Sequence, residues 1–139
     1  MSRRDARITA LMGLFSLDYS EDGNPEQIVT ALSEEEEHPL RRKEDQAYAL
    51  LLVEGTRKHL AEIDQELNGL SKEWEVPRMA GVDRNLLRLA DFEMFYSDEK
   101  IPPAVAINEA VEITKIFGGD ESPQFVNGLL GTLVKKHGV

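Results

Sequence analysis

Apolar residues recur at steps of three and four along most of this 139-residue chain, which predicts α-helices. Residues 105–131 show the pattern best, as two apolar helices joined by a glycine-containing turn. The first has so little polar surface that we place it in the middle of a bundle. We expect Gly118 and Gly119 to end it with positive φ angles, and Ser122 with Pro123 to start the next helix as N-cap and first-turn proline.

The second helix of this pair contains two more glycines, Gly128 and Gly131. A glycine inside a helix costs roughly 1 kcal/mol relative to alanine. Glycines retained at that cost predict that another backbone approaches this helix closely.

The same spacing predicts three helices nearer the N-terminus. Residues 4–19 have an apolar face that includes Phe15 and Tyr19, residues 24–33 begin with a capping pattern, and residues 42–70 form one long helix. The length of the third suggests that it crosses the whole molecule.

A fourth helix is predicted over residues 82–96, after a connector in which Trp74 and Val76 are expected to close one end of the bundle. Its polar residues are expected to face outward, and they are Asp83, Arg84, Asn85, Arg88 and Asp91. Because no strand pattern and no repeat is found, the sequence predicts an all-α fold in a single domain of residues 1–139.

The net charge of -10 argues at first against a nucleic-acid partner, since binding to a polyanion depends on lysine and arginine. Most of that charge is local, because residues 21–37 carry seven acids and no base. A small basic patch elsewhere can still act within a Debye length of about 8 Å. The acidic run 34–37 is either a solvated loop that keeps the protein soluble or a flap that repels non-specific RNA.

The sequence offers little for catalysis. The absence of cysteine excludes disulfides, thiolate zinc sites and a cysteine nucleophile, and it suits a cytoplasmic location. No signal peptide or membrane-spanning run is expected, so no membrane partner is predicted. His38, His59 and His137 lack the spacing of metal ligands, and Glu109 with Glu112 is interpreted as a solvated helix face. We therefore expect no catalytic residue, no cofactor and no metal, and hence no enzyme.

The remaining possibility is a binding function. Arg3, Arg4 and Arg7 lie at the edge of the first helix's apolar face, although cations are disfavoured in a first helical turn. Together with a helix N-terminus at Ser122 they are suited to hold phosphates, and Phe125 could stack on a base. The alternatives are a solvated chain terminus for the arginines and core packing for Phe125.

Three segments, RRDARITALMGLFS, VDRNLLRLADFEMF and VAINEAVEITKIFGGDESPQFVNGLLG, resemble the NusB family of bacterial transcription antitermination factors. The resemblance covers nearly the whole chain apart from residues 21–37. It implies a bundle of about seven helices in two helical subdomains and no enzymatic activity. It also implies RNA-binding to single-stranded boxA of nascent ribosomal RNA, pairing with the ribosomal protein NusE, and assembly with NusA and NusG on RNA polymerase.

The resemblance also assigns roles to single residues. It places RNA contacts on Arg3, Arg4, Arg7, Glu121, Ser122 and Phe125, and NusE binding on Asp83. Asp5 interrupts the arginine run, so RNA affinity is expected to depend more strongly on NusE. The acid of the turn is the pair Asp120 and Glu121, and either can fill the family position.

Two other hypotheses fit the same residues. One is a protein-interaction module, for example a homodimer in which the RNA surface is occluded. The other is a stand-alone relative of the accessory domain of ribosomal RNA cytosine methyltransferases, since 139 residues leave no room for the methyltransferase fold itself.

Overall fold

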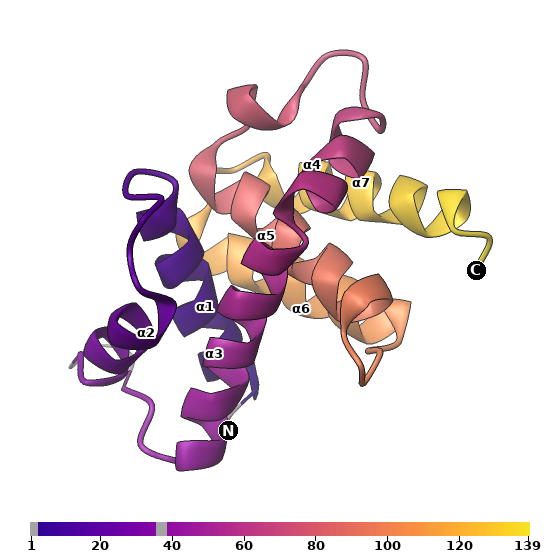
Figure 1. The fold of residues 1–139 in the computed structure, drawn as a ribbon. Helices are drawn as coiled ribbons and strands as arrows, with labels where there is room; N and C mark the ends of the chain where they lie inside the picture. Colours follow the sequence, from indigo (N-terminus) through magenta and orange to yellow (C-terminus); the bar gives the residue numbers. More distant parts are fainter. Residues whose placement is uncertain (1–2, 36–38) are drawn as a thin grey trace. The chain divides into compact units, whose positions relative to one another are not determined.

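The computed structural model describes residues 3–35 and 39–139, and the regular elements in these ranges are all helical (Figure 1). The α-helices are α1 (Arg3–Leu17), α2 (Pro25–Ser33), α3 (Lys43–Lys58), α4 (Leu60–Asn68), α5 (Gly81–Asp91), α6 (Pro103–Phe117) and α7 (Ser122–Lys136). A 3₁₀ turn, Val76–Arg78, precedes α5, and a π-helical turn, Phe92–Tyr96, follows it. The predicted all-α fold is confirmed. None of the helices within these ranges is long and apolar enough to span a bilayer.

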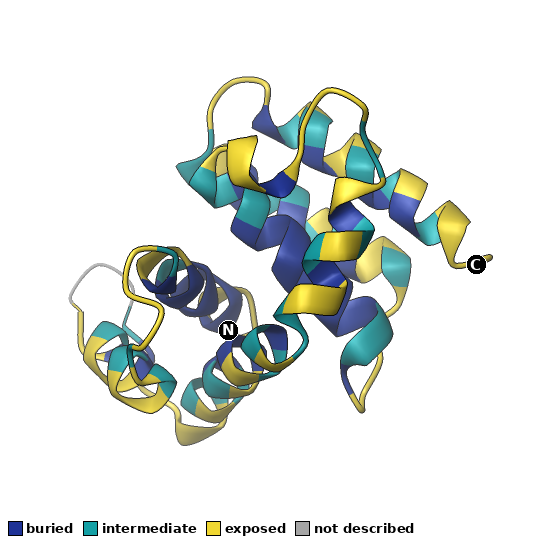
Figure 2. Cartoon of the chain, turned by 45° about the horizontal axis from the view of Figure 1, so that its top comes forward, coloured by how far each residue is buried: buried dark blue, intermediate teal, exposed yellow. Residues whose placement is uncertain are grey.

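The chain divides into two compact units, Met1–Arg57 and Lys58–Val139. In each unit the buried residues gather on the helix faces that meet other helices, and the exposed residues lie on the opposite faces and in the connections (Figure 2). Of the acidic run 34–37, only Glu34 and Glu35 are described. Glu36 and Glu37 lie outside the described residues, as does His38.

The first unit has its core between α1, α2 and α3. Gly13 of α1 marks the place where they meet, because a Cβ atom there would lie 3.4 Å from Val53 of α3 and 3.6 Å from Ile28 of α2. The predicted short helix is confirmed as α2, and its N-cap Asn24 accepts a hydrogen bond from the Gln27 backbone N–H at 3.1 Å.

Phe15 and Tyr19 were expected in this core, and that expectation is wrong. They are 39% and 75% exposed, and their rings contact each other edge to face at 5.5 Å. The helix ends at Leu17, so Tyr19 lies beyond the part of the chain in which helical spacing still sets direction.

The long helix predicted over residues 42–70 is two helices, α3 and α4, separated by His59 with φ -105° and ψ 17°. The apolar spacing continues across this break, which is why the break could not be predicted. Leu52 is buried in the first unit, whereas Ile63 and Leu67 are buried in the second. Periodicity shows that a residue is buried but not in which core.

In the second unit α5 packs against α4, α6 and α7. Every residue from 85 to 91 is buried, so the prediction that the polar residues of this helix face outward is wrong for Asp83, Asn85, Arg88 and Asp91. Three of these four side chains have hydrogen-bond partners inside the unit, which reduces the cost of burying them.

The turn between α6 and α7 requires glycine for a different reason from the one expected. Gly138 is the only described residue with a positive φ, and Gly118 has φ -90° and ψ -177°. A Cβ at Gly118 would lie 2.7 Å from the Ser122 Cβ and 2.9 Å from the Thr114 carbonyl oxygen. Gly118 therefore permits a close approach of Ser122.

The expectation of a backbone close to Gly128 and Gly131 is also wrong. No described atom outside their own helix backbone and chain neighbours lies within 4 Å of a Cβ built at either position. These two glycines therefore lower the stability of α7, and no described neighbour prevents a larger side chain at either position.

We predict opposite effects for alanine at two of these glycines. Gly118→Ala forces a clash with backbone and should lower the free energy of unfolding by about 1–3 kcal/mol. Gly128→Ala should raise it by up to about 1 kcal/mol, because it removes glycine's entropic cost in a helix. Urea unfolding followed by the fluorescence of the single tryptophan, Trp74, measures both in the second unit. A gain for both variants would contradict the steric argument.

Candidate nucleic-acid interface

The first group of candidate residues lies at the start of α1. Arg3 and Arg4 are exposed, whereas Arg7 is only 4% exposed, so the expectation that Arg7 lies at the rim of the apolar face is wrong. Both Arg3 and Arg7 contact Tyr48 of α3, since the Arg3 Cζ lies 4.1 Å and the Arg7 Cζ 5.9 Å from the centroid of its ring. Cation–π contacts of this kind hold a guanidinium in place while leaving its edge able to donate hydrogen bonds.

Tyr48 could not be identified from the sequence. It lies about forty residues from the arginines and has no special spacing within its own helix. Of the three candidate arginines, Arg3 and Arg4 are therefore exposed and Arg7 is buried.

The second group surrounds an open hollow of about 610 Å³ in the second unit. Its walls come from the connector before α5, from the first turn of α5, and from the turn and first residues of α7. The expected residues Asp83, Glu121, Ser122 and Phe125 all line it. The arginines of α1 belong to the other compact unit.

Two aromatic rings line this hollow. Phe125 is half-buried, so it is part of the wall and not of the deep core, which the neighbouring Val126 fills at 0% exposure. Trp74 is 43% exposed, and the expectation that it closes the bundle is wrong because Val76 takes the buried position instead. The Ser71 hydroxyl accepts the Trp74 backbone N–H at 3.3 Å and shapes this turn.

Ser122 has a different role from the predicted N-cap. The N-cap position is Glu121, and the Ser122 Oγ instead accepts the Gly119 N–H at 3.0 Å and donates to the Asp83 carboxylate. The Ser122 N–H donates to the Gly119 carbonyl at 3.1 Å, and Pro123 has no N–H. The start of α7 is therefore poorer in available N–H groups than a phosphate site requires.

The charges around the hollow also argue against a phosphate site. Asp83, Asp120 and Glu121 outnumber the single base, Arg78. Burial raises the pKa of the Asp83 carboxyl above its ordinary 3.8, and the hydrogen bond from Ser122 partly opposes that shift. An acidic hollow with two rings suits an unpaired base or a basic protein segment better than a phosphate group.

We predict that Ser122→Ala raises the pKa of Asp83 further, because it removes the bond that favours the ionised form. A raised pKa gives a contribution to stability that is complete below pH 3.8 and is lost as the pH rises through the folded-state pKa. In the variant that loss should extend to higher pH. NMR titration of the Asp83 carboxyl measures the shift, with Thr132→Ala as a control on the exposed face of α7. An unchanged pKa would show that Ser122 does not act on Asp83.

Comparison with known proteins gives consistent matches. The family model described as the NusB family matches residues 4–135. The transcription antitermination protein NusB of Pelotomaculum thermopropionicum is 44% identical over 135 residues, which cover 97% of this chain and 90% of that protein. The protein of the same name from Bacillus velezensis is 41% identical over 133 residues, or 96% of this chain and 95% of that protein.

Solved structures agree with the sequence relatives. T. maritima NusB has a TM-score of 0.84 at 32% identity, over 98% of this chain and 92% of that one. A chain in the crystal structure of the antitermination factors NusB and NusE in complex with dsRNA has a TM-score of 0.81 at 29% identity, over 96% of each chain. On sequence and fold together, this chain belongs to the NusB family.

Proposed function

We propose that this protein is an RNA-binding transcription antitermination factor that works together with NusE. The observation that carries the proposal is the likeness, over 96% of both chains, to a chain of the complex of NusB and NusE with dsRNA. The two groups of candidate residues give the proposal a physical basis, because one supplies positive charge and the other supplies the exposed ring of Trp74 and the half-buried ring of Phe125.

The two groups contribute to RNA binding in different ways. The exposed guanidinium groups of Arg3 and Arg4 neutralise phosphates, which contributes affinity without sequence preference. Trp74 and Phe125 stack on unpaired bases, which selects single-stranded over double-stranded RNA. This combination fits the boxA element of nascent ribosomal RNA, and a factor that acts on nascent transcripts works in the bacterial cytoplasm.

The acidic wall of the hollow binds the protein partner, NusE. Asp83 is only 8% exposed, so its contribution to NusE binding is to fix Ser122 and the turn that carries Asp120 and Glu121. Although the resemblance gives Glu121 an RNA contact, both acids of the turn are exposed, and their negative charge gives a basic partner a complementary surface. NusA, NusG and RNA polymerase complete the assembly that the pair joins.

The arginines can be tested through salt dependence. Each of Arg3→Ala and Arg4→Ala should lower the slope of log affinity against log salt by about 0.7, the loss of one phosphate contact on a single strand. Gel-shift titration with boxA RNA and a scrambled RNA, with and without NusE, measures this. Lys135→Ala removes the same charge at the far end of α7 and should leave the slope unchanged.

Two results would contradict this assignment. Equal affinity for boxA and scrambled RNA in the presence of NusE would reject boxA recognition. Equal slopes for Arg3→Ala, Arg4→Ala and Lys135→Ala would remove the arginines from the RNA surface. Arg7→Ala is not a useful probe, because Arg7 is buried and its loss should destabilise the first unit.

The rings should behave differently from the arginines. Trp74→Ala and Phe125→Ala should each weaken boxA binding by about 1–3 kcal/mol while leaving the salt slope unchanged, because stacking releases no counterions. Tyr19→Ala removes an exposed ring far from the hollow residues in sequence and serves as the control. Unchanged affinity in Trp74→Ala, whose exposed side chain supports little of the core, would show that bases do not enter the hollow.

A further inference from the structure

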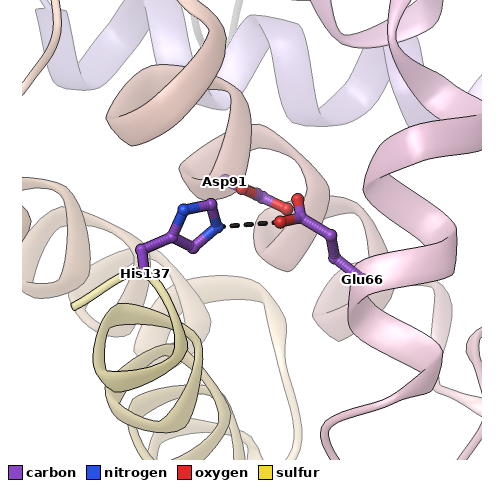
Figure 3. Close-up of side chains that lie close together, drawn as sticks. All are labelled: Glu66, Asp91 and His137. Carbon is purple, nitrogen blue, oxygen red and sulfur yellow. Dashed lines mark hydrogen bonds and ion pairs between the residues drawn. The ribbon is translucent and has the colours of Figure 1, made fainter.

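Three potential metal ligands meet in the second unit, away from the hollow (Figure 3). Glu66 comes from α4, Asp91 is the last residue of α5, and His137 directly follows α7. One ligand atom of each lies within 4.8 Å of the others, and the His137 Nε2 is 2.8 Å from the Glu66 Oε2. These residues are far apart in sequence, so the spacing rules that argued against a metal site did not apply to them.

Asp91 is the member of this cluster that needs a partner. Its exposure is 0%, and no N–H or hydroxyl donor among the described residues reaches either carboxylate oxygen, so that a hydrogen bond to the neighbouring Glu66 carboxyl needs a proton shared between the two acids. Figure 3 shows its carboxylate beside that of Glu66. Burial, together with the Glu66 carboxyl, raises the pKa of Asp91 to about 9. A buried carboxylate without a donor is costly, and a cation is one of the few groups that removes the cost.

The surroundings hold the other two ligands in fixed directions. The Tyr96 hydroxyl donates to the Glu66 Oε1 at 2.8 Å, which leaves Oε2 turned toward His137. The Phe95 ring stacks on the His137 imidazole with centroids 3.7 Å apart and planes 7° from parallel. Contacts of this kind orient the ligands of metal sites in proteins.

We propose that Glu66, Asp91 and His137 bind a divalent first-row transition metal ion of the zinc class. One imidazole nitrogen and two carboxylates are a ligand set that such ions accept. Ligand atoms around a tetrahedral zinc lie about 3.4 Å apart, so movements of an ångström or so close the site. The Glu66 and His137 side chains are each 28% exposed, which lets the ion enter and leaves a position for water.

The bound ion ties together α4, α5 and the end of α7. Its effect is therefore structural, and it adds to the proposed RNA function without depending on it. Because the ion binds the folded chain, it should raise thermal stability in proportion to the logarithm of its concentration above the dissociation constant.

The test uses the full chain, freed of metal with a chelator and dialysed. Titration with ZnCl2 in a calorimeter should show one saturable site per chain, and thermal unfolding should shift upward over the same concentrations. MgCl2, which prefers octahedral oxygen ligands, should have little effect. CoCl2 should give the visible absorption of a low-symmetry site containing nitrogen.

Two ligand variants and one control separate this site from surface binding. Asp91→Asn and His137→Gln should each weaken zinc binding more than tenfold. His59→Gln removes another histidine that faces a glutamate, with Nδ1 3.4 Å from the Glu62 Oε1, but without a buried carboxylate beside it. This control should bind zinc like the unchanged chain.

Asp91→Asn also distinguishes loss of the metal site from loss of the fold. With a pKa of about 9 the Asp91 carboxyl is protonated near neutral pH, and the amide resembles that neutral acid in shape, so the metal-free variant should be about as stable as the unchanged chain. Absence of a saturable zinc site in the unchanged chain would overturn the proposal, and a proton shared by Glu66 and Asp91 would then account for the cluster. Equal zinc affinity in His137→Gln and His59→Gln would overturn it as well.

Discussion

Two hydrogen bonds of 2.8 Å join the Arg88 guanidinium of α5 to the Asp64 carboxylate of α4, and the polar architecture of the second unit depends on them. The Arg88 side chain is 8% exposed, so the charge is almost fully removed from water. Such a pair contributes little net stability compared with an apolar replacement. Removal of one partner alone, however, leaves a buried charge unpaired and costs about 3–5 kcal/mol. Its main effect is to fix the rotation of α5 about its own axis.

That rotation positions two other aspartates on the same helix. Asp83, near the start of α5, meets Ser122 at the hollow, and Asp91, at its end, meets Glu66 and His137. Both are buried, and burial raises the pKa of each. They differ in their partners, since Asp83 receives a hydroxyl donor whereas Asp91 faces a second carboxyl. Among the described residues, one helix thus carries, near its start, an acid with one carboxylate oxygen left without a partner and, at its end, an acid with both oxygens left without one.

The sequence predicted those features that depend on neighbours along the chain. The α2 cap at Asn24 and the helices α6 and α7 were predicted because caps, prolines and helical periodicity are local signals. The expectation that α6 lies in the middle of the bundle is wrong, because its Val105 and Ile116 are 47% and 55% exposed. Arg88 was assigned to the surface, because its partner Asp64 lies 24 residues away along the chain. Tyr48 beside Arg3, and His137 beside Glu66, were missed for the same reason. The RNA and NusE roles of the candidate residues remain predictions.

The π-helical turn Phe92–Tyr96 has a consequence for how this chain tolerates change in length. A π turn is an α-helix that accommodates one additional residue, and it rotates the downstream side chains by about 100° relative to an unbroken helix. Upstream of it Arg88 stays directed at Asp64, while downstream Phe95 and Tyr96 reach His137 and Glu66. Deletion of a single residue within the turn would restore an unbroken helix and put these two sets of contacts out of phase. The extra residue therefore allows the contacts before the turn and the contacts after it to form in the same chain.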